Sequence, residues 1–317
     1  MITTSTTALF LFMSESFKFQ KLLWPIHPWP RVMRLLVAIL ALALLPACSA
    51  VKLVYNQLPD VGYWWLDGYV DFNEAQTLSV RGELGRLLRW HRTEELPKII
   101  SLLQKAQRLA GTDLAAEPVC ALADQVRERL LVLSVQAEPT MVALAMSLGP
   151  DQITHIERKF AKTNAQWRED WLDGSAADRL EQRLKNSVER SEQFYGPLDE
   201  RQRLAWRTRL TASAFDPQQA YAERLRRQQD LLQILRLANG APPRPEPAAV
   251  TAMLRAYLDR VAQSPNPIYR SYSDRLLREG CQTFAEVHNI TTPEQRERAE
   301  RRLAVYARDT QELQAQR

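Results

Sequence analysis

The chain has 317 residues, of which 45% are hydrophobic and 25% charged, and its net charge is +5. Residues 1–47 hold four basic residues and one acidic residue, so the remainder carries only about +2, which argues against a nucleic-acid-binding protein. Glycine is scarce, and Leu, Ala, Arg, Gln and Glu dominate. These residues favour helices, so we expect an all-α fold, an irregular multi-helix bundle.

An apolar run from Leu35 to Leu45 follows Arg34 and leads into Pro46-Ala47-Cys48. The run has the length of a signal-peptide core and falls short of the roughly 20 residues that span a bilayer. The sequence from Leu45 to Cys48 resembles the lipobox of bacterial lipoproteins, although Pro46 departs from its usual small residue. That resemblance implies cleavage after Ala47 and a diacylglycerol on Cys48, which would become the N-terminus and anchor the protein in the membrane.

The residue after Cys48 bears on the choice of membrane. Lipoproteins retained at the inner membrane typically carry Asp there, and this chain has Ser49. We therefore expect the periplasmic face of the outer membrane. A plain secretory signal, or a membrane helix with an incidental cysteine, is the alternative interpretation.

The segment before the signal has an unusual composition for a signal peptide. Residues 1–31 contain four phenylalanines, two lysines and three prolines without a sustained helical period. Since a signal peptide begins a few residues before its apolar core, we expect translation to start at Met33, with Met13 as the second choice.

The mature chain opens with a short apolar segment, residues 51–55, and then the densest aromatic cluster, which contains Trp64, Trp65 and Tyr69. The rings could pack the first helices together as core. Alternatively, one or two of them could lie at the membrane interface, where Trp and Tyr are favoured.

Apolar residues then recur with helical spacing along most of the chain. The pattern predicts helices over residues 75–92, 95–109, 119–135, 139–148, 151–171, 176–195, 202–214, 218–237, 250–261, 268–287 and 293–313. Pro139 would occupy the first turn of its helix, a position that proline tolerates.

One proline-rich linker, residues 241–247, interrupts these helices. We expect residues 48–240 to form the main helical domain. The apolar content of residues 248–317 is thin, so their helices should pack on that domain rather than fold alone.

A short pattern recurs at five helix starts, each with a capping residue followed three positions later by Gln. The pairs are Asn73 and Gln76, Gly149 and Gln152, Asp199 and Gln202, Asp216 and Gln219, and Thr292 and Gln295. Physically this is a capping box, in which Gly149 cannot supply the side-chain half. The pattern is similar to the LTxxQ repeats of Spy-type periplasmic chaperones and to helix starts of lipase foldases. Five ordinary helix caps would give the same pattern, and the irregular spacing excludes a solenoid array.

Over nearly all of the mature chain, the sequence resembles a family of bacterial lipoproteins classed only as a domain of unknown function. The residues that carry the resemblance include Cys48, residues 64–69, Gln76, residues 90–92, Cys120, Cys281 and residues 291–296. The resemblance implies an envelope location and a helical fold, and it implies no activity.

The four histidines are His27, His91, His155 and His288. Only His91 has a suggestive setting, beside Trp90 and Arg92 and downstream of Asp67 and Asp71. A His with a nearby carboxylate could perform acid–base catalysis, although a structural His near a helix end is the commoner case. We found no HExxH or GxSxG motif, no phosphate-binding glycine loop, and no clustered Cys or His for a metal, so no cofactor is expected.

Two basic runs lie at residues 224–227 and 296–302, interleaved with Glu at helical spacing. This spacing is typical of an exposed face laced with salt bridges. The alternative is contact with lipid A or peptidoglycan.

Cys120 and Cys281 remain once Cys48 is acylated, and an even pair in an oxidising compartment predicts a disulfide. Such a bond would pin the helices after the linker to the main domain. Two separate buried thiols are the alternative.

The sequence thus predicts a lipid-anchored helical lipoprotein that binds, scaffolds or chaperones an envelope component, with an envelope protein or peptidoglycan as partner. Its predicted binding cluster comprises Trp64, Trp65, Asp67, Tyr69, Trp90, His91 and Arg92. The alternative is an envelope enzyme that uses His91 with Asp67 or Asp71.

Overall fold

The computed structural model describes residues 50–316, and the predicted signal peptide with Cys48 lies outside them. The described chain is helical throughout and contains no strand, which confirms the all-α prediction. The helices are α3 (Ala50–Asn56), α4 (Leu58–Val70), α5 (Glu74–Trp90), η1 (His91–Glu95), α6 (Leu96–Ala110), α7 (Ala116–Ser147), α8 (Pro150–Trp171), α9 (Ala176–Tyr195), α10 (Glu200–Thr211), α11 (Pro217–Ala238), α12 (Pro247–Ala262), α13 (Pro267–Asn289) and α14 (Pro293–Ala315).

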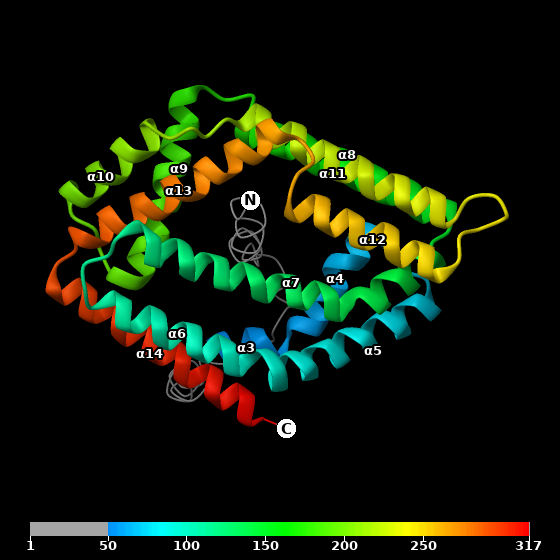
Figure 1. Cartoon of the computed structure of the whole chain (residues 1–317), viewed down its shortest axis with the longest axis horizontal. Coiled ribbons are helices and arrows are strands. Elements are labelled where there is room, and N and C mark those ends of the chain that lie inside the picture. Colours follow the sequence, from blue (N-terminus) through cyan, green and yellow to red (C-terminus); the bar gives the residue numbers. More distant parts are fainter. Residues whose placement is uncertain (1–49, 317) are drawn as a thin grey trace, which may run out of the picture.

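The helices are arranged as an elongated frame with α7 crossing its middle (Figure 1). Neighbouring helices pack in pairs along the frame, including α14 on α6, α9 on α10 and α4 on α5, while α7 contacts both α12 and α13. The first and last parts of the chain meet, since α14 also contacts α3.

A continuous helical rod replaces the two separate helices predicted over residues 75–92 and 95–109. Helix α5 continues through a π-helical turn, η1, into α6, and the Leu96 N–H donates to the His91 carbonyl five residues earlier. Pro97 follows in the first turn of α6, where its missing N–H is tolerated. The rod runs from Glu74 to Ala110.

Helix α7 also differs from the sequence prediction, which placed a new helix at Pro139. The structure has one 32-residue helix that runs through Pro139. Proline lacks an N–H, so the Val135 carbonyl loses its usual helical donor, but the helix is not interrupted. Contacts to α5, α12 and α13 hold it on both sides of the proline.

Three of the predicted capping boxes are complete, at Asn73, Asp199 and Thr292. At Gly149 only the Gln152 half is present, with the Gly149 N–H donating to Oε1 at 3.0 Å, as expected for a residue without a side chain. Asp216 caps its helix but is not part of a reciprocal box, because its own N–H donates to the Tyr272 hydroxyl instead.

The glutamines of these boxes also pair with each other across the fold. Gln76 and Gln152 exchange two amide hydrogen bonds of 2.6 and 3.2 Å, which join the N-termini of α5 and α8. Gln202 and Gln295 do the same at 2.6 and 3.1 Å and join α10 to α14. One local motif therefore also makes two tertiary junctions, one at each end of the frame.

The largest hydrophobic core lies around one of these junctions. It gathers the end of α4, the C-terminal end of α7, and parts of α8, α11 and α12, including Val70, Val142, Ile153, Leu235 and Val250. A second core joins α6, α9, α10 and α14 around the other junction. Residues 119–140, which we call the central span of α7, contribute to none of the buried clusters of the described chain.

A disulfide joins Cys120 in α7 to Cys281 in α13, with Cα atoms 5.5 Å apart, as predicted. The proline-rich residues 241–246 connect α11 to α12, and α12, α13 and α14 each pack on helices from the earlier part of the chain. The disulfide thus joins α13, which follows the proline-rich linker, to α7, the helix that crosses the frame.

Candidate functional site

The predicted binding cluster is divided between two places in the structure. Asp67 and Asp71 lie at the C-terminal end of α4, beside the start of α5. His91 directly follows the other end of α5, so the 17 residues of that helix, about 25 Å of rise, separate them. The structure therefore does not bring His91 together with either carboxylate.

Both aspartates have local structural roles. Asp67 Oδ1 accepts the Phe72 N–H at 3.0 Å, and Asp71 ends α4 in the left-handed conformation with φ of 58°. The adjacent Tyr69 packs edge-on against Phe160 of α8, with 6.0 Å between ring centroids. This part of the cluster closes the α4–α5 turn and joins it to α8.

His91 instead helps to join η1 to α3. Its Nδ1 lies 3.0 Å from the Tyr55 hydroxyl, and burial lowers the pKa of His91 and raises the pKa of Tyr55 to about 12. Arg92 donates to the Asn56 side chain at 2.8 Å. Trp90 meets the His91 ring edge-on, with centroids 6.4 Å apart. The geometry is that of a helix junction with a neutral imidazole.

His288 has a closely related setting at the other end of the frame, and no sequence pattern predicts it. Its Nε2 donates to the Thr112 carbonyl at 2.8 Å, so Nδ1 accepts from the Tyr195 hydroxyl, also at 2.8 Å. The side chain is buried, and this burial lowers its pKa. The neutral ring links α9 and α13 to the loop before α7.

Trp64 and Trp65 of the cluster are not core residues. Trp64 is 70% exposed and Trp65 46% exposed, although the Trp65 ring also contacts Tyr69. The expectation that these rings pack the first helices together is therefore wrong for both. Tyr63, by contrast, bonds to Thr77 of α5 through its hydroxyl, at 3.1 Å.

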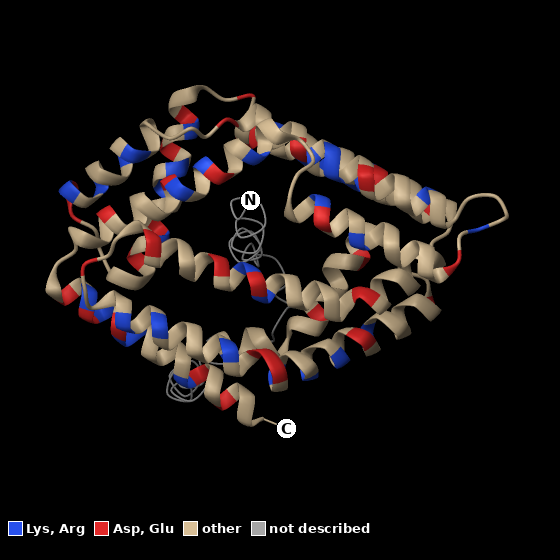
Figure 2. Cartoon of the chain, viewed as in Figure 1, with Lys and Arg blue, Asp and Glu red and all other residues tan. Residues whose placement is uncertain are grey.

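The two basic runs differ from each other. Arg226 and Arg227 of the first run pair with the buried Glu223, and Arg224 donates to Asn164 of α8, so this run is internal rather than an exposed face. In the second run, Arg301 pairs with Glu297 on the exposed side of α14, as predicted. Basic and acidic residues are interleaved along the helices of the described chain (Figure 2), a distribution that does not favour an anionic polymer as partner.

The central span of α7 is the most unusual surface of the described chain. Leu131 is 42% exposed, Val135 is 67% exposed, and Val126 is 38% exposed. Between Leu130 and Ser147, Glu138 is the only charged residue. Exposed apolar surface of this kind marks an interaction site more often than a solvated face.

Polar contacts hold this span in place. Arg129 lies 3.5 Å from the buried Glu95 of η1, and Arg127 donates to the Ala262 carbonyl at the end of α12. Further along, Thr140 donates to Glu83 of α5 at 2.9 Å, and Arg255 of α12 donates to Glu138 at 2.7 Å. The helix is thus fixed from several sides while Val126, Leu131 and Val135 stay exposed.

Within residues 50–316, α7 is also the one helix whose length and composition would suffice to cross a membrane. Its disulfide to α13 and its ion pairs to η1 and α12 place it among the helices of the bundle.

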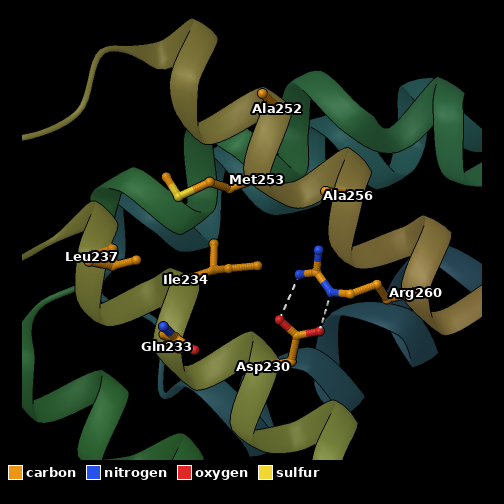
Figure 3. A pocket seen from close by; sticks show the side chains of 8 residues that line it. All are labelled: Asp230, Gln233, Ile234, Leu237, Ala252, Met253, Ala256 and Arg260. Carbon is orange, nitrogen blue, oxygen red and sulfur yellow. Dashed lines mark hydrogen bonds and ion pairs between the residues drawn. The ribbon is translucent and has the colours of Figure 1, made fainter. Parts of the chain in front are cut away.

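A shallow groove of about 390 Å³ lies between α11 and α12. Its wall is apolar, with Ile234, Leu237, Met253 and two alanines, and an ion pair between Asp230 and Arg260 closes one end (Figure 3). The described residues contain no group of three or more His, Cys, Asp or Glu side chains placed to bind a metal ion. The groove offers apolar contact and a fixed ion pair, and no nucleophile.

Comparison with known proteins gives a family and no activity. No curated protein and no solved structure matches the chain significantly. A family model, described as a family of unknown function, matches residues 68–280, which include α5 to α12 and Cys120 and end one residue before Cys281. The chain therefore belongs to this family of unknown function, DUF6279.

Proposed function

We propose that this protein is a lipid-anchored lipoprotein on the periplasmic face of the bacterial outer membrane that holds an apolar segment of another envelope protein. The lipobox-like sequence ending at Cys48 supports the anchor and the location. The disulfide agrees with an oxidising compartment. The role is one of binding, scaffolding or chaperoning.

The exposed central span of α7 is the observation that carries the binding role. Fully burying a side chain such as Val or Leu contributes about 1.5–3 kcal/mol, and the fold leaves Val135 and Leu131 largely outside its cores. The central span lies on the helix that crosses the middle of the frame (Figure 1), and contacts of α7 with α5, α12 and α13 hold that helix in place. Around Leu131 and Val135 the surface suits an apolar polypeptide better than peptidoglycan or lipid A, because Glu138 is the one charged residue between Leu130 and Ser147 and it is paired with Arg255.

The enzyme alternative has less support in this geometry. Its acid–base pair needs His91 near Asp67 or Asp71, and these residues flank opposite ends of α5. The binding role uses residues that the fold leaves exposed.

Crosslinking in intact cells tests the proposal. A photoreactive amino acid is placed at Val135 and, separately, at Leu131, with Leu204 of α10 as a control of similar exposure, 62% against 67% for Val135. We expect both α7 positions to capture the same envelope protein through an apolar segment, identified by mass spectrometry. Equal capture of that protein at position 204, or no adduct at either α7 position, would contradict the binding role.

A further inference from the structure

The first two helices of the described chain behave as one. Gln57 joins α3 to α4 with helical backbone angles, its N–H donates to the Leu53 carbonyl, and its carbonyl accepts from Val61. On a helical period, one side of this unit carries the outer face of α3–α4, which we define as Leu53, Val54, Leu58, Val61, Trp64 and Trp65. Every one of these side chains is exposed, from 38% for Val54 to 70% for Trp64.

This face gathers many of the exposed apolar side chains of residues 50–316. Fourteen large hydrophobic residues are exposed in the described chain, and six of them lie on this face between Leu53 and Trp65. If exposed hydrophobic residues were placed at random, they would lie singly on different helices, as Leu78, Leu204 and Ile268 do. A contiguous apolar face of this kind marks an interaction site.

Two charged side chains of these helices, Lys52 and Asp60, are engaged in ion pairs with other helices. Lys52 lies 3.8 Å from Asp309 of α14, and Asp60 pairs with Arg81 of α5 at 2.7 Å. The opposite side packs into the protein, where Tyr55 and Val70 are buried. The six side chains of the outer face carry no charge, so an apolar partner suits them.

We propose that the outer face of α3–α4 inserts into the interfacial region of the membrane, so that this helical unit lies along the bilayer surface. The inference deepens the proposed function and rests on its lipid anchor, because Cys48 precedes the start of α3 at Ala50 by two residues. Acyl chains at that position would hold the face at the bilayer surface. Two exposed tryptophans among aliphatic residues suit the boundary between headgroups and acyl chains, where Trp is favoured.

The insertion gives the anchor a function beyond tethering. A lipid on a flexible N-terminus leaves the attached protein free to rotate, whereas a helical face in the interface fixes the orientation of the frame. Because α3 and α4 also contact α14, α5 and α8, the orientation of the unit determines that of the rest of the molecule.

Depth-dependent quenching tests the insertion. Trp64→Cys and Ile268→Cys are matched, since the two side chains are 70% and 71% exposed and lie on different helices. The introduced thiol is the one available for a fluorophore when Cys48 is acylated and Cys120 is bonded to Cys281. The labelled full-length lipoproteins are reconstituted into phosphatidylethanolamine–phosphatidylglycerol vesicles that contain nitroxide-labelled lipids.

We expect quenching at position 64 to exceed that at position 268 by roughly threefold or more, as for a group buried at the acyl boundary. Equal quenching at the two positions would refute the insertion. A fluorescence change at position 64 that depends on protein concentration without vesicles would refute it in favour of a second copy on this face. The intact mass of the purified protein reports the acylation of Cys48 separately, so a failed anchor is distinguishable from a failed face.

Discussion

The glutamine pair between α10 and α14 gives the sharpest stability prediction of the structure. Gln202 is fully buried and makes four side-chain hydrogen bonds. Its Oε1 accepts from the Asp199 N–H and from Gln295, and its Nε2 donates to Gln295 and to the Ile290 carbonyl. Gln202→Ala removes all four hydrogen bonds and leaves each partner group without its bond to this side chain.

The magnitude follows from these bonds. A net contribution of about 1 kcal/mol for each hydrogen bond gives a loss of about 4 kcal/mol, and water that enters the space would reduce this to about 3 kcal/mol. Gln229→Ala is the control, because Gln229 is an exposed glutamine within a helix and its loss should change the free energy of unfolding by less than about 0.5 kcal/mol.

Urea unfolding followed by circular dichroism measures the effect. We expect the midpoint for Gln202→Ala to fall by about 1 M or more, with little change for Gln229→Ala. In a double-mutant cycle with Gln295→Ala, the double variant should lose about 1–2 kcal/mol less free energy of unfolding than the sum of the two single losses, since the residues share two of the bonds. Strict additivity, or a Gln202→Ala loss no larger than the control, would refute the idea that capping glutamines join helices across the fold.

Three further outcomes are expected. Replacing Cys120 and Cys281 by Ser should lower the free energy of unfolding by at most about 5 kcal/mol, as calculated from their separation of 161 residues, and urea unfolding that matches the wild type would contradict this. Burial lowers the pKa of His288, so the unfolded chain binds more protons than the folded chain below about pH 6.5. The free energy of unfolding should therefore fall as the pH falls through that value. His288→Ala should weaken this pH dependence, measured by urea unfolding at pH 5.5 and 7.5. Cys48→Ser should abolish acylation, which the intact mass would show; identical masses at the N-terminus of wild type and variant, apart from the substitution itself, would count against the anchor.

Local features of the fold could be predicted from the sequence. Cap residues followed by Gln identify the starts of α5, α10 and α14, because a capping box needs only residues three positions apart. The disulfide follows from the number of cysteines and the expected compartment. The pairing of Gln202 with Gln295 does not follow, since it depends on how two distant helix ends meet.

The differences between the predicted and the observed α7 have physical causes as well. Pro139 interrupts only one backbone hydrogen bond, and packing on both sides keeps α7 continuous, which no local rule reveals. The run Leu130-Leu131-Val132-Leu133 followed by Val135 surrounds the helix with apolar residues, so one buried side could not accommodate all of them. This signal for an exposed surface was present in the sequence.

The most direct test of the proposed function measures binding of an apolar polypeptide to the central span of α7. The probe is fluorescently labelled, reduced and carboxymethylated α-lactalbumin, a permanently unfolded chain, and the readout is fluorescence anisotropy. Leu131→Asp combined with Val135→Asp is compared with the control Leu204→Asp, after circular dichroism and urea unfolding have shown that all three proteins are folded.

If α7 holds apolar segments, the double variant should bind at least about tenfold more weakly, which corresponds to a loss of about 1.4 kcal/mol from two side chains. The Leu204→Asp protein should bind as the wild type does. Equal affinities for all three proteins, or no binding by the wild type, would contradict the account.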